Sequence, residues 1–383
     1  MFTRLLNLAA LLSFSSGLIA GESPSNQEPI GMRTYTQELT LVFTSPEDAA
    51  KAKLVALPVF EGKKWAFSAR WDDNNASHMR MHDAMKKHGL MGTFYLNQGT
   101  APPLKPASAF GSDYARKLMA DGFSIGVHCQ THPFLPTQTP NEIFYEMLGN
   151  RVERECQTGW PINTMVFPYG QHSSALDPSV HETITQVFVR SGIHNTAYRD
   201  FVEKNPGLHP FEVSTSYQVT PGDRTIDALN FDKQMEKVLK LDPLTADAHC
   251  INLGVHVWQS GEAWDDLDAL FAKYAHRPDF WYCNMTQYSA YERQFRHSRI
   301  EALAPKGAAR TFRITRPIGA ELGDDIPLTL AVRDGKLAEI KTNGFDCQKF
   351  ESDGSTLLQL AHSEEQKVPT HIAGVDNTEN APV

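Results

Sequence analysis

Strand-like and helix-like segments alternate from Trp65 to Asn284, and this alternation constrains the fold more than any other feature of the chain. Strands that are repeatedly followed by helices predict a parallel α/β architecture. About seven such repeats predict a distorted (β/α) barrel, in which chemistry gathers at the carboxyl ends of the strands. The predicted strands are 65–70, 92–96, 122–128, 163–167, 193–198, 211–219, 250–258 and 280–284. The predicted helices are 78–88, 114–120, 139–158, 178–191, 226–241 and 262–274.

The first residues have the layout of an export signal. Arg4 precedes an uncharged apolar run from Leu5 to Ala20, and small polar residues follow it. A membrane span needs about 20 apolar residues, so a signal peptide that is removed on export is favoured over an uncleaved anchor. We therefore expect an exported protein (periplasmic, cell-surface or secreted) with no stable membrane span after cleavage.

Short strands separated by Gly and Asp turns follow the α/β region. From Thr311 onward their alternating pattern predicts a small antiparallel β-rich appendage. The segment 284–299 is expected either to cap the barrel or to form a surface helix. The expected organisation is a signal peptide, a leader with short strands, the barrel, a β-rich C-terminal domain and a flexible tail, at residues 1–20, 21–60, 61–305, 306–362 and 363–383.

Charge and cysteine usage exclude several classes of protein. Lys and Arg total 36 against 45 Asp and Glu, a formal net charge of −9 without any basic run. Such a chain has no electrostatic drive toward nucleic acid or an anionic membrane. The five cysteines are widely spaced and form no CxxC pair, which argues against a zinc ribbon or a dense disulfide framework. One or two disulfide bridges in an oxidising compartment stay open.

Carboxylate and imidazole side chains follow several of the predicted strands. Asp72 and Asp73 end the first strand, His128 and His132 follow the third, and His256 lies in a later one. Neighbouring residues of a regular strand point to opposite faces, so both carboxylates share one site only if the backbone bends there. One carboxylate with two imidazoles suits a catalytic zinc-like ion that keeps an open position for water.

A second His-x3-His pair competes with this interpretation. His78 and His82 lie four residues apart on a predicted helix, where they could bind a metal as a pair. A partly solvated helix face is the simpler explanation for them. His128 and His132 are preferred because a strand delivers them to the mouth of the barrel. His256 alone could equally be a core histidine, so the prediction of a metal site depends on the joint occurrence of the motifs.

Taken in order, these motifs resemble those of the polysaccharide deacetylase family (NodB homology, carbohydrate esterase family 4), over roughly residues 65–284. The family arginine that orients the catalytic aspartate is missing, because Val166 stands in its place. The family motifs T-F-D-D-G, H-[ST]-x-x-H, R-x-P-Y and L-x-L-H correspond to 70–74 (RWDDN), 128–132 (HCQTH), 166–169 (VFPY) and 253–256 (LGVH).

The resemblance implies a metal-dependent hydrolase that removes N-acetyl or O-acetyl groups from a carbohydrate polymer or oligosaccharide. Such an enzyme acts on carbon–nitrogen bonds other than peptide bonds. The implied cofactor is a divalent metal, most often Zn²⁺. The implied roles are metal ligand for Asp73, His128 and His132, base for Asp72, acid for His256 and oxyanion donor for the backbone N–H of Tyr169.

Aromatic residues near the strand ends are candidates to stack on sugar rings, and core packing is the alternative for each. They are Trp71, Tyr169, Trp258 and Trp281, of which Trp258 is preferred because it follows His256 by two residues on the same face. Two other functions stay open. The missing arginine motivates a carbohydrate-binding protein on a deacetylase scaffold, and the metal motif also fits hydrolysis of a C–N bond in a small amide.

Overall fold

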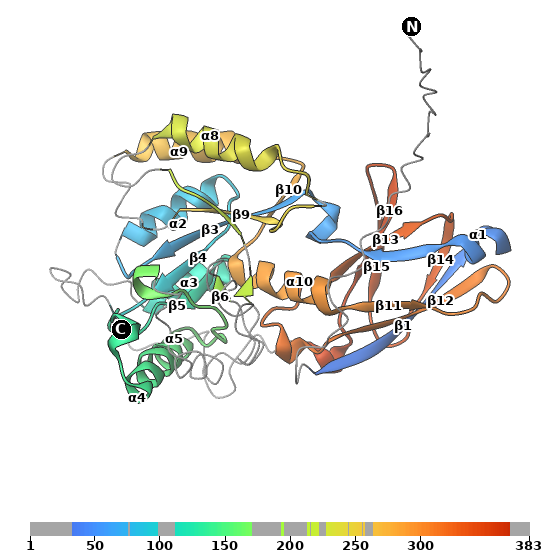
Figure 1. The fold of residues 1–383 in the computed structure, drawn as a ribbon, viewed down its shortest axis with the longest axis horizontal. Helices are drawn as coiled ribbons and strands as arrows, with labels where there is room; N and C mark the ends of the chain where they lie inside the picture. Colours follow the sequence, from blue (N-terminus) through green and yellow to red (C-terminus); the bar gives the residue numbers. More distant parts are fainter. Residues whose placement is uncertain are drawn as a thin grey trace, which may run out of the picture.

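The computed structural model describes residues 33–75, 77–98, 112–170, 193–194, 213–214, 216–221, 227–243, 245–254, 256 and 263–367. These residues form an α/β part and a β-rich part, which lie side by side along the long axis of the molecule (Figure 1). The expected signal peptide at 1–20, the expected helix at 178–191 and Trp258 lie outside the described residues.

A parallel sheet of six strands forms the centre of the α/β part. Its strand order is β5-β4-β3-β9-β8, and β10 pairs with the first half of β3. The predicted α/β class is confirmed. Closure into a barrel of about seven strands is not, because the described strands form an open order and β6 and β7 pair separately. The strands are β3 (Trp65–Asp72), β4 (Thr93–Leu96), β5 (Ser124–Val127), β6 (Ile193–His194), β7 (Val213–Ser214), β8 (Tyr217–Val219), β9 (Cys250–Leu253) and β10 (Phe280–Tyr282).

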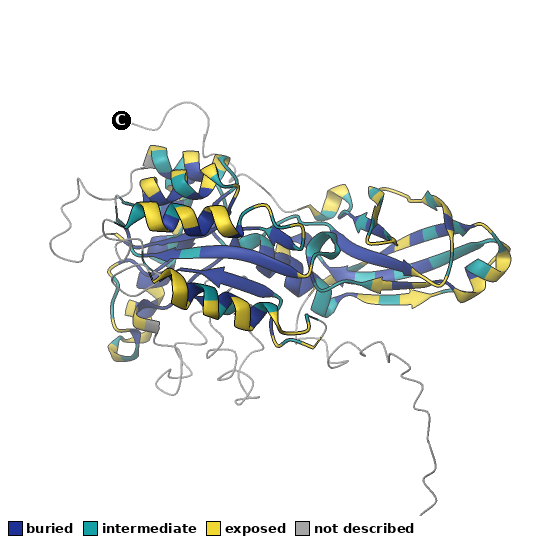
Figure 2. Cartoon of the chain, turned by 90° about the horizontal axis from the view of Figure 1, so that it is seen from above, coloured by how far each residue is buried: buried dark blue, intermediate teal, exposed yellow. Residues whose placement is uncertain are grey.

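Helices cover the sheet and bury their apolar faces on it. Met81 and Met85 of one helix and Phe231 and Met235 of another belong to the same core as the strand residue Phe94. Figure 2 shows buried strands in the middle of the molecule and helices along both sides, with their outward faces exposed. The helices are α2 (Ser77–Lys87), α3 (Ser112–Ala120), α4 (Pro140–Phe144), α5 (Asn150–Thr158), α8 (Ala228–Leu239) and α9 (Trp264–Tyr274).

The helical segment predicted at 139–158 begins and ends where its sequence indicates. The Thr139 side chain and Glu142 form a capping box at its start, and Gly159 ends it in a left-handed conformation. A π-helical turn, Tyr145–Gly149, separates α4 from α5. Such turns are rare and redirect the side chains within them, which the periodicity of the sequence does not show.

Two antiparallel four-stranded sheets make up the β-rich part. Their orders are β11-β12-β1-β14 and β15-β16-β13-β2, and one apolar core lies between them. The leader strands β1 and β2 thus pair with strands from the end of the chain, with α1 (Pro46–Lys51) between them. The strands are β1 (Thr34–Phe43), β2 (Lys53–Ala56), β11 (Arg299–Ala302), β12 (Ala309–Pro317), β13 (Leu328–Arg333), β14 (Leu337–Lys341), β15 (Cys347–Ser352) and β16 (Ser355–Leu360).

Helix α10 (Met285–His297) joins the two parts (Figure 1). Most of its residues are buried, so the expected surface helix is wrong. The helix begins beside the amino end of β5, where Asn284 donates to the Gly122 carbonyl, so it does not cap the carboxyl ends of the strands. The Tyr291 hydroxyl donates to the Leu57 carbonyl at 2.9 Å, and the Gln294 amide donates to the Ile326 carbonyl at 2.7 Å. The helix is buried because its aromatic side chains pack and its polar side chains satisfy backbone groups of the β-rich part.

Two further expectations concern the disulfide bridges and the membrane. All five cysteines are free thiols, so neither of the bridges left open by the sequence is formed. Within the described ranges, no helix combines the length and the apolar character that crossing a membrane requires.

Candidate metal centre

Asp73, His128 and His132 converge at the carboxyl ends of β3 and β5. One ligand atom from each lies within 4.8 Å of the others. The Nε2 atoms of His132 and His128 lie 3.4 Å and 3.6 Å from Asp73 Oδ1. In a tetrahedral site with metal–ligand bonds of about 2.1 Å, neighbouring donor atoms are ~3.4 Å apart. The donor types and their spacing therefore fit a small divalent cation.

The backbone bends after Asp72, as a shared site for the two carboxylates requires. Strand β3 ends at Asp72, and Asp73 has a φ of 72°. Positive φ also occurs at Cys129 (59°), His132 (59°) and Tyr169 (60°). Each such residue costs roughly 1–3 kcal/mol of backbone strain, and strain of this kind collects at functional sites. The motif residues are thus held in conformations that the surrounding structure must enforce.

A backbone carbonyl fixes the orientation of His128. The Nδ1–H of His128 donates to the Val166 carbonyl at 3.0 Å, which leaves the lone pair on Nε2, the atom nearest Asp73. Burial lowers the pKa of His128, so the ring is neutral at pH 7. A neutral imidazole with its second nitrogen hydrogen-bonded is the usual form of a metal ligand. Val166, where the family arginine is missing, therefore still supports the site through its backbone.

Glu146 holds the loop between the two histidines, and sequence reasoning missed it. Its carboxylate accepts from the backbone N–H groups of Gln130 and Thr131 at 2.8 and 2.7 Å, and from the Thr131 hydroxyl at 2.7 Å. Glu146 is buried and belongs to the π-helical turn. No local motif announces this contact, because the turn is not visible in the sequence.

Arg70 forms an ion pair with Asp72, and this arginine too was missed. Arg70 Nε donates to Asp72 Oδ1 at 3.2 Å, and Arg70 Nη2 donates to Oδ2. Burial would raise the pKa of Asp72, but Arg70 and the nearby His128 hold it below its usual value. Residues two apart on a strand share a face, so the sequence did contain this signal. An arginine therefore does contact the aspartate, from β3 rather than from the position of Val166.

His256 lies at the edge of the cluster and outside the group of three. Its Nε2 is 3.9 Å from Asp73 Oδ2, and its backbone forms a parallel β-bridge with Asp72. Its side chain is about a quarter exposed (27%), so it borders the open side of the site. All five predicted catalytic and metal-binding side chains thus gather in one place.

Some of the aromatic candidates lie in the core, and others are exposed beside the metal centre. Trp71 and Trp281 are 1% and 9% exposed and belong to the core. Tyr169 is 63% exposed, and its ring centroid lies 4.5 Å from that of His132. Phe134, which the sequence did not single out, is 41% exposed and lies 6.4 Å from the Tyr169 ring. Two exposed aromatic rings therefore stand beside the metal centre.

The competing pair His78 and His82 does not form a second metal site. The solvated helix face expected for them is wrong, because both are fully buried. His78 Nε2 lies 3.2 Å from the Asp72 carbonyl oxygen. His82 instead contacts the Tyr114 hydroxyl at 2.6 Å and Asp121 at 3.2 Å. The two rings therefore serve separate polar contacts within the core.

Comparisons with known proteins agree with the motifs. The polysaccharide deacetylase family model matches residues 62–187, and the curated proteins contain no match. Among solved structures, a mutant of a CE4 family pseudoenzyme with restored enzymatic activity, whose wild type is from Bacillus anthracis, is 16% identical, with a TM-score of 0.38 over 59% of this chain and 67% of that one. A polysaccharide deacetylase from Bacillus cereus is 14% identical (TM-score 0.36, covering 57% and 91%). A peptidoglycan deacetylase from Bacillus subtilis is also 14% identical (TM-score 0.37, covering 60% and 92%). We draw no conclusion about activity from structural matches with these TM-scores. The family model confirms the resemblance to the polysaccharide deacetylase family over residues 62–187, which contain the first three motifs but not the motif at 253–256.

Proposed function

We propose that this protein is an exported, metal-dependent hydrolase that removes N-acetyl or O-acetyl groups from a carbohydrate. The convergence of Asp73, His128 and His132, beside an Asp72 that Arg70 pairs with, is the observation that supports it most. Export rests on the first 20 residues, which lie outside the described part of the chain.

The three ligands would hold a divalent ion, zinc by the donor set, which when bound lowers the pKa of a water toward about 7. In this proposal, Asp72 takes a proton from the water, which attacks the acetyl carbonyl carbon. The Tyr169 backbone N–H donates to the resulting oxyanion. His256 then protonates the leaving nitrogen as the C–N bond breaks. The products are acetate and a free amino sugar.

The exposed rings of Tyr169 and Phe134 are proposed to contact the sugar. The Tyr169 ring lies beside His132, and the Phe134 ring lies beside Tyr169. Aromatic faces provide stacking surfaces with little loss of side-chain freedom. Trp258, two residues beyond His256, stays a proposed contact as well.

The proposal is tested by acetate release from N-acetylated oligosaccharides derived from chitin and peptidoglycan and from an acetylated xylan fragment. The His256→Ala variant should lose about 10²–10⁴-fold in turnover on an amide, because a poor leaving group needs protonation. On an aryl acetate, whose leaving group needs no proton, the loss should be small. His297→Ala, at the end of α10 and away from the metal centre, serves as the control.

Three outcomes contradict the proposal in different ways. Near wild-type turnover of His256→Ala on an amide removes His256 from its role. A protein that binds sugar but no metal and releases no acetate is a carbohydrate-binding protein. A protein that binds metal but releases acetate from no sugar points to a small amide substrate.

A further inference from the structure

A cavity of about 200 Å³ lies at the junction of the α/β part and the β-rich part. It opens beside the start of β5, near Ser124, whereas the metal centre follows the end of the same strand at His128. Four residues of strand separate these ends by about 13 Å. The cavity is therefore a separate place on the molecule from the proposed catalytic site.

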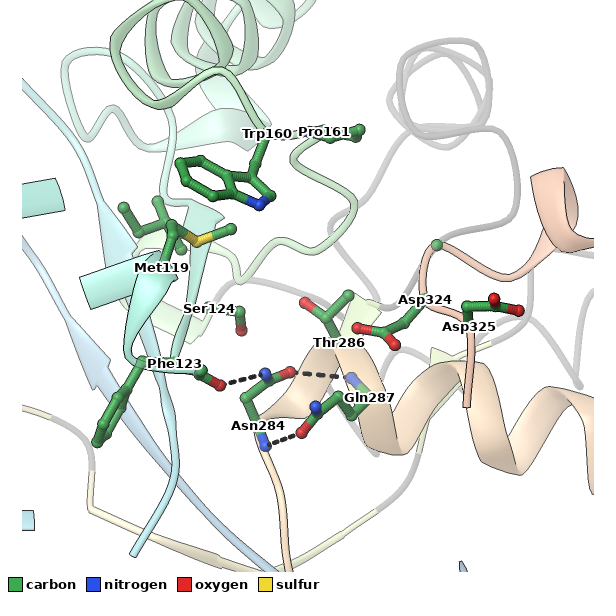
Figure 3. A pocket seen from close by; sticks show the side chains of 13 residues that line it. Met119, Phe123, Ser124, Trp160, Pro161, Asn284, Thr286, Gln287, Asp324 and Asp325 are labelled. Atoms are coloured by element: carbon green, nitrogen blue, oxygen red, sulfur yellow. Dashed lines mark hydrogen bonds between the residues drawn. The ribbon is translucent and has the colours of Figure 1, made fainter. Parts of the chain in front are cut away.

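The cavity has an apolar side and a polar side. Trp160 and Met119 stand on one side of the space, and Asn284 and Gln287 stand across from them (Figure 3). A mixed lining with one large aromatic ring is typical of sites for small polar ring compounds. An indole face also attracts cations.

The polar side is rigid because its groups are already fixed by hydrogen bonds. Asn284 caps α10: its side-chain oxygen accepts from the Gln287 N–H at 2.9 Å, and its amide donates to the Gly122 carbonyl at 2.9 Å. Gln287 completes the capping box by accepting from the Asn284 N–H at 3.1 Å. A wall that is held in this way loses little freedom when a ligand binds.

Asp324 gives the cavity its charge. The neighbouring Asp325 also lines the cavity, but its carboxylate already accepts a hydrogen bond from His362 at 2.9 Å (Figure 3). Within the described part of the chain, no Lys, Arg or His side chain forms an ion pair with Asp324. Burial raises the pKa of Asp324 to about 6, and the charge of Asp325 adds to this effect. Asp324 is half-buried in the cavity wall, and a cation that enters the cavity stabilises its carboxylate.

We propose that this cavity binds a protonated amine carried on a single sugar ring, with the ammonium group against Asp324 and the ring against Trp160. Two carboxylates disfavour an anion, and a neutral apolar ligand would leave Asp324 without compensation. The volume suits one ring rather than a polymer segment. The choice of an amino sugar rests on the proposed function, because the product of that reaction is an amino sugar. The preference for a cation with a ring rests only on the charge and the aromatic side chain of the cavity.

Glucosamine is the probe, and N-acetylglucosamine is its matched control because it has the same ring without the positive charge. Ligand-observed NMR titration of the full chain at pH 7.5 should show saturable binding of glucosamine. N-acetylglucosamine should bind at least about tenfold more weakly. Asp324→Asn and Trp160→Ala should each weaken glucosamine binding about tenfold or more.

Asp353→Asn removes the same charge from an exposed turn and should leave binding unchanged. Thermal unfolding of each variant checks the fold, and Asp324→Asn keeps the test valid if Trp160→Ala does not fold.

The results separate this proposal from the proposed function. Glucosamine binding that depends on Asp324, in a protein that releases no acetate, supports the cavity and overturns the hydrolase. Equal binding of both sugars, no binding of glucosamine, or binding that survives Asp324→Asn overturns the cavity proposal, whatever the acetate assay shows.

Discussion

Arg70 controls the ionisation and the orientation of the Asp72 carboxylate. Asp72 is only 2% exposed, and a carboxylate that is buried without a partner would take up a proton. The guanidinium of Arg70 contacts both of its oxygens, which keeps it ionised and fixes its orientation. A proton acceptor that is held in one orientation is what general-base catalysis needs, so Arg70 acts on the reaction through Asp72.

Replacing Arg70 tests this positioning role. Arg70→Gln should lower kcat for acetate release by about 10–100-fold, because misplaced catalytic groups cost this much. Arg70→Lys should fall in between, since it keeps the charge but loses the two-pronged contact. The pH at which activity is half lost on the acid side should rise in Arg70→Gln, because the largest effect that opposes burial and lowers the pKa of Asp72 is then removed. Arg80→Gln, an exposed arginine on α2, is the control, and equal turnover of the two Gln variants would contradict the role.

Glu146 and Glu142 provide a matched pair for the histidine loop. Glu146→Gln should weaken metal binding about 10–100-fold, the usual cost of losing a group that orients ligands. Glu142 lies one turn earlier and only caps α4, so Glu142→Gln should leave metal affinity unchanged. Competition with a chelator measures both. Equal affinities in the two variants would show that the loop holds its shape without Glu146.

At the scale of elements, Gly254 fixes the end of β9, which carries the chain toward His256. Gly254 has a φ of 84°, and a Cβ there would lie 2.3 Å from the Trp71 ring. Gly344 has a similar φ of 78° but nothing within 4 Å of its Cβ position. The two glycines therefore separate the cost of backbone strain from the cost of a clash.

Alanine at each glycine measures this difference. Gly344→Ala should cost about 1 kcal/mol of unfolding free energy from strain alone. Gly254→Ala should cost more, by about 1–3 kcal/mol, because the Trp71 ring must move within the core. It should also lower activity by shifting His256. Equal midpoints in urea for the two variants would mean that the Trp71 side chain adapts without cost.

The elements that the sequence predicts correctly depend on local sequence patterns. The helix start at Thr139 and the histidines that follow a strand are both indicated by neighbouring residues in the sequence. The missed features depend on partners far apart in the chain: Glu146 reaches the histidine loop from a π-helical turn, and β1 pairs with β12. Periodicity reports which face of an element is apolar but not which element covers it.

For the whole molecule, buried histidines make stability depend on pH. Burial lowers the pKa of His78 to about 4, from 6.5 when it is exposed in the unfolded chain. The unfolded state therefore binds more protons, and stability falls as the pH falls from about 6.5 toward 4. His78 packs on Phe94 and approaches the Asp72 carbonyl, so this loss reaches the proposed site.

His78→Gln isolates this contribution, because glutamine does not titrate. Between pH 7 and pH 4.5, wild type should lose roughly 2 kcal/mol more unfolding free energy than the variant. Urea denaturation in the presence of a chelator measures both, so that release of metal at low pH does not contribute. An equal loss in both proteins would show that His78 is protonated in the folded state.

The most direct test of the central claim is a zinc titration of metal-free protein while acetate release from N-acetylated oligosaccharides is followed. The proposed site predicts that release rises to a plateau at one ion per chain. It also predicts that Asp73→Ala and His132→Ala neither bind that ion nor release acetate. Release that is unchanged by removing the metal, or an ion still bound when both residues are replaced, would contradict it.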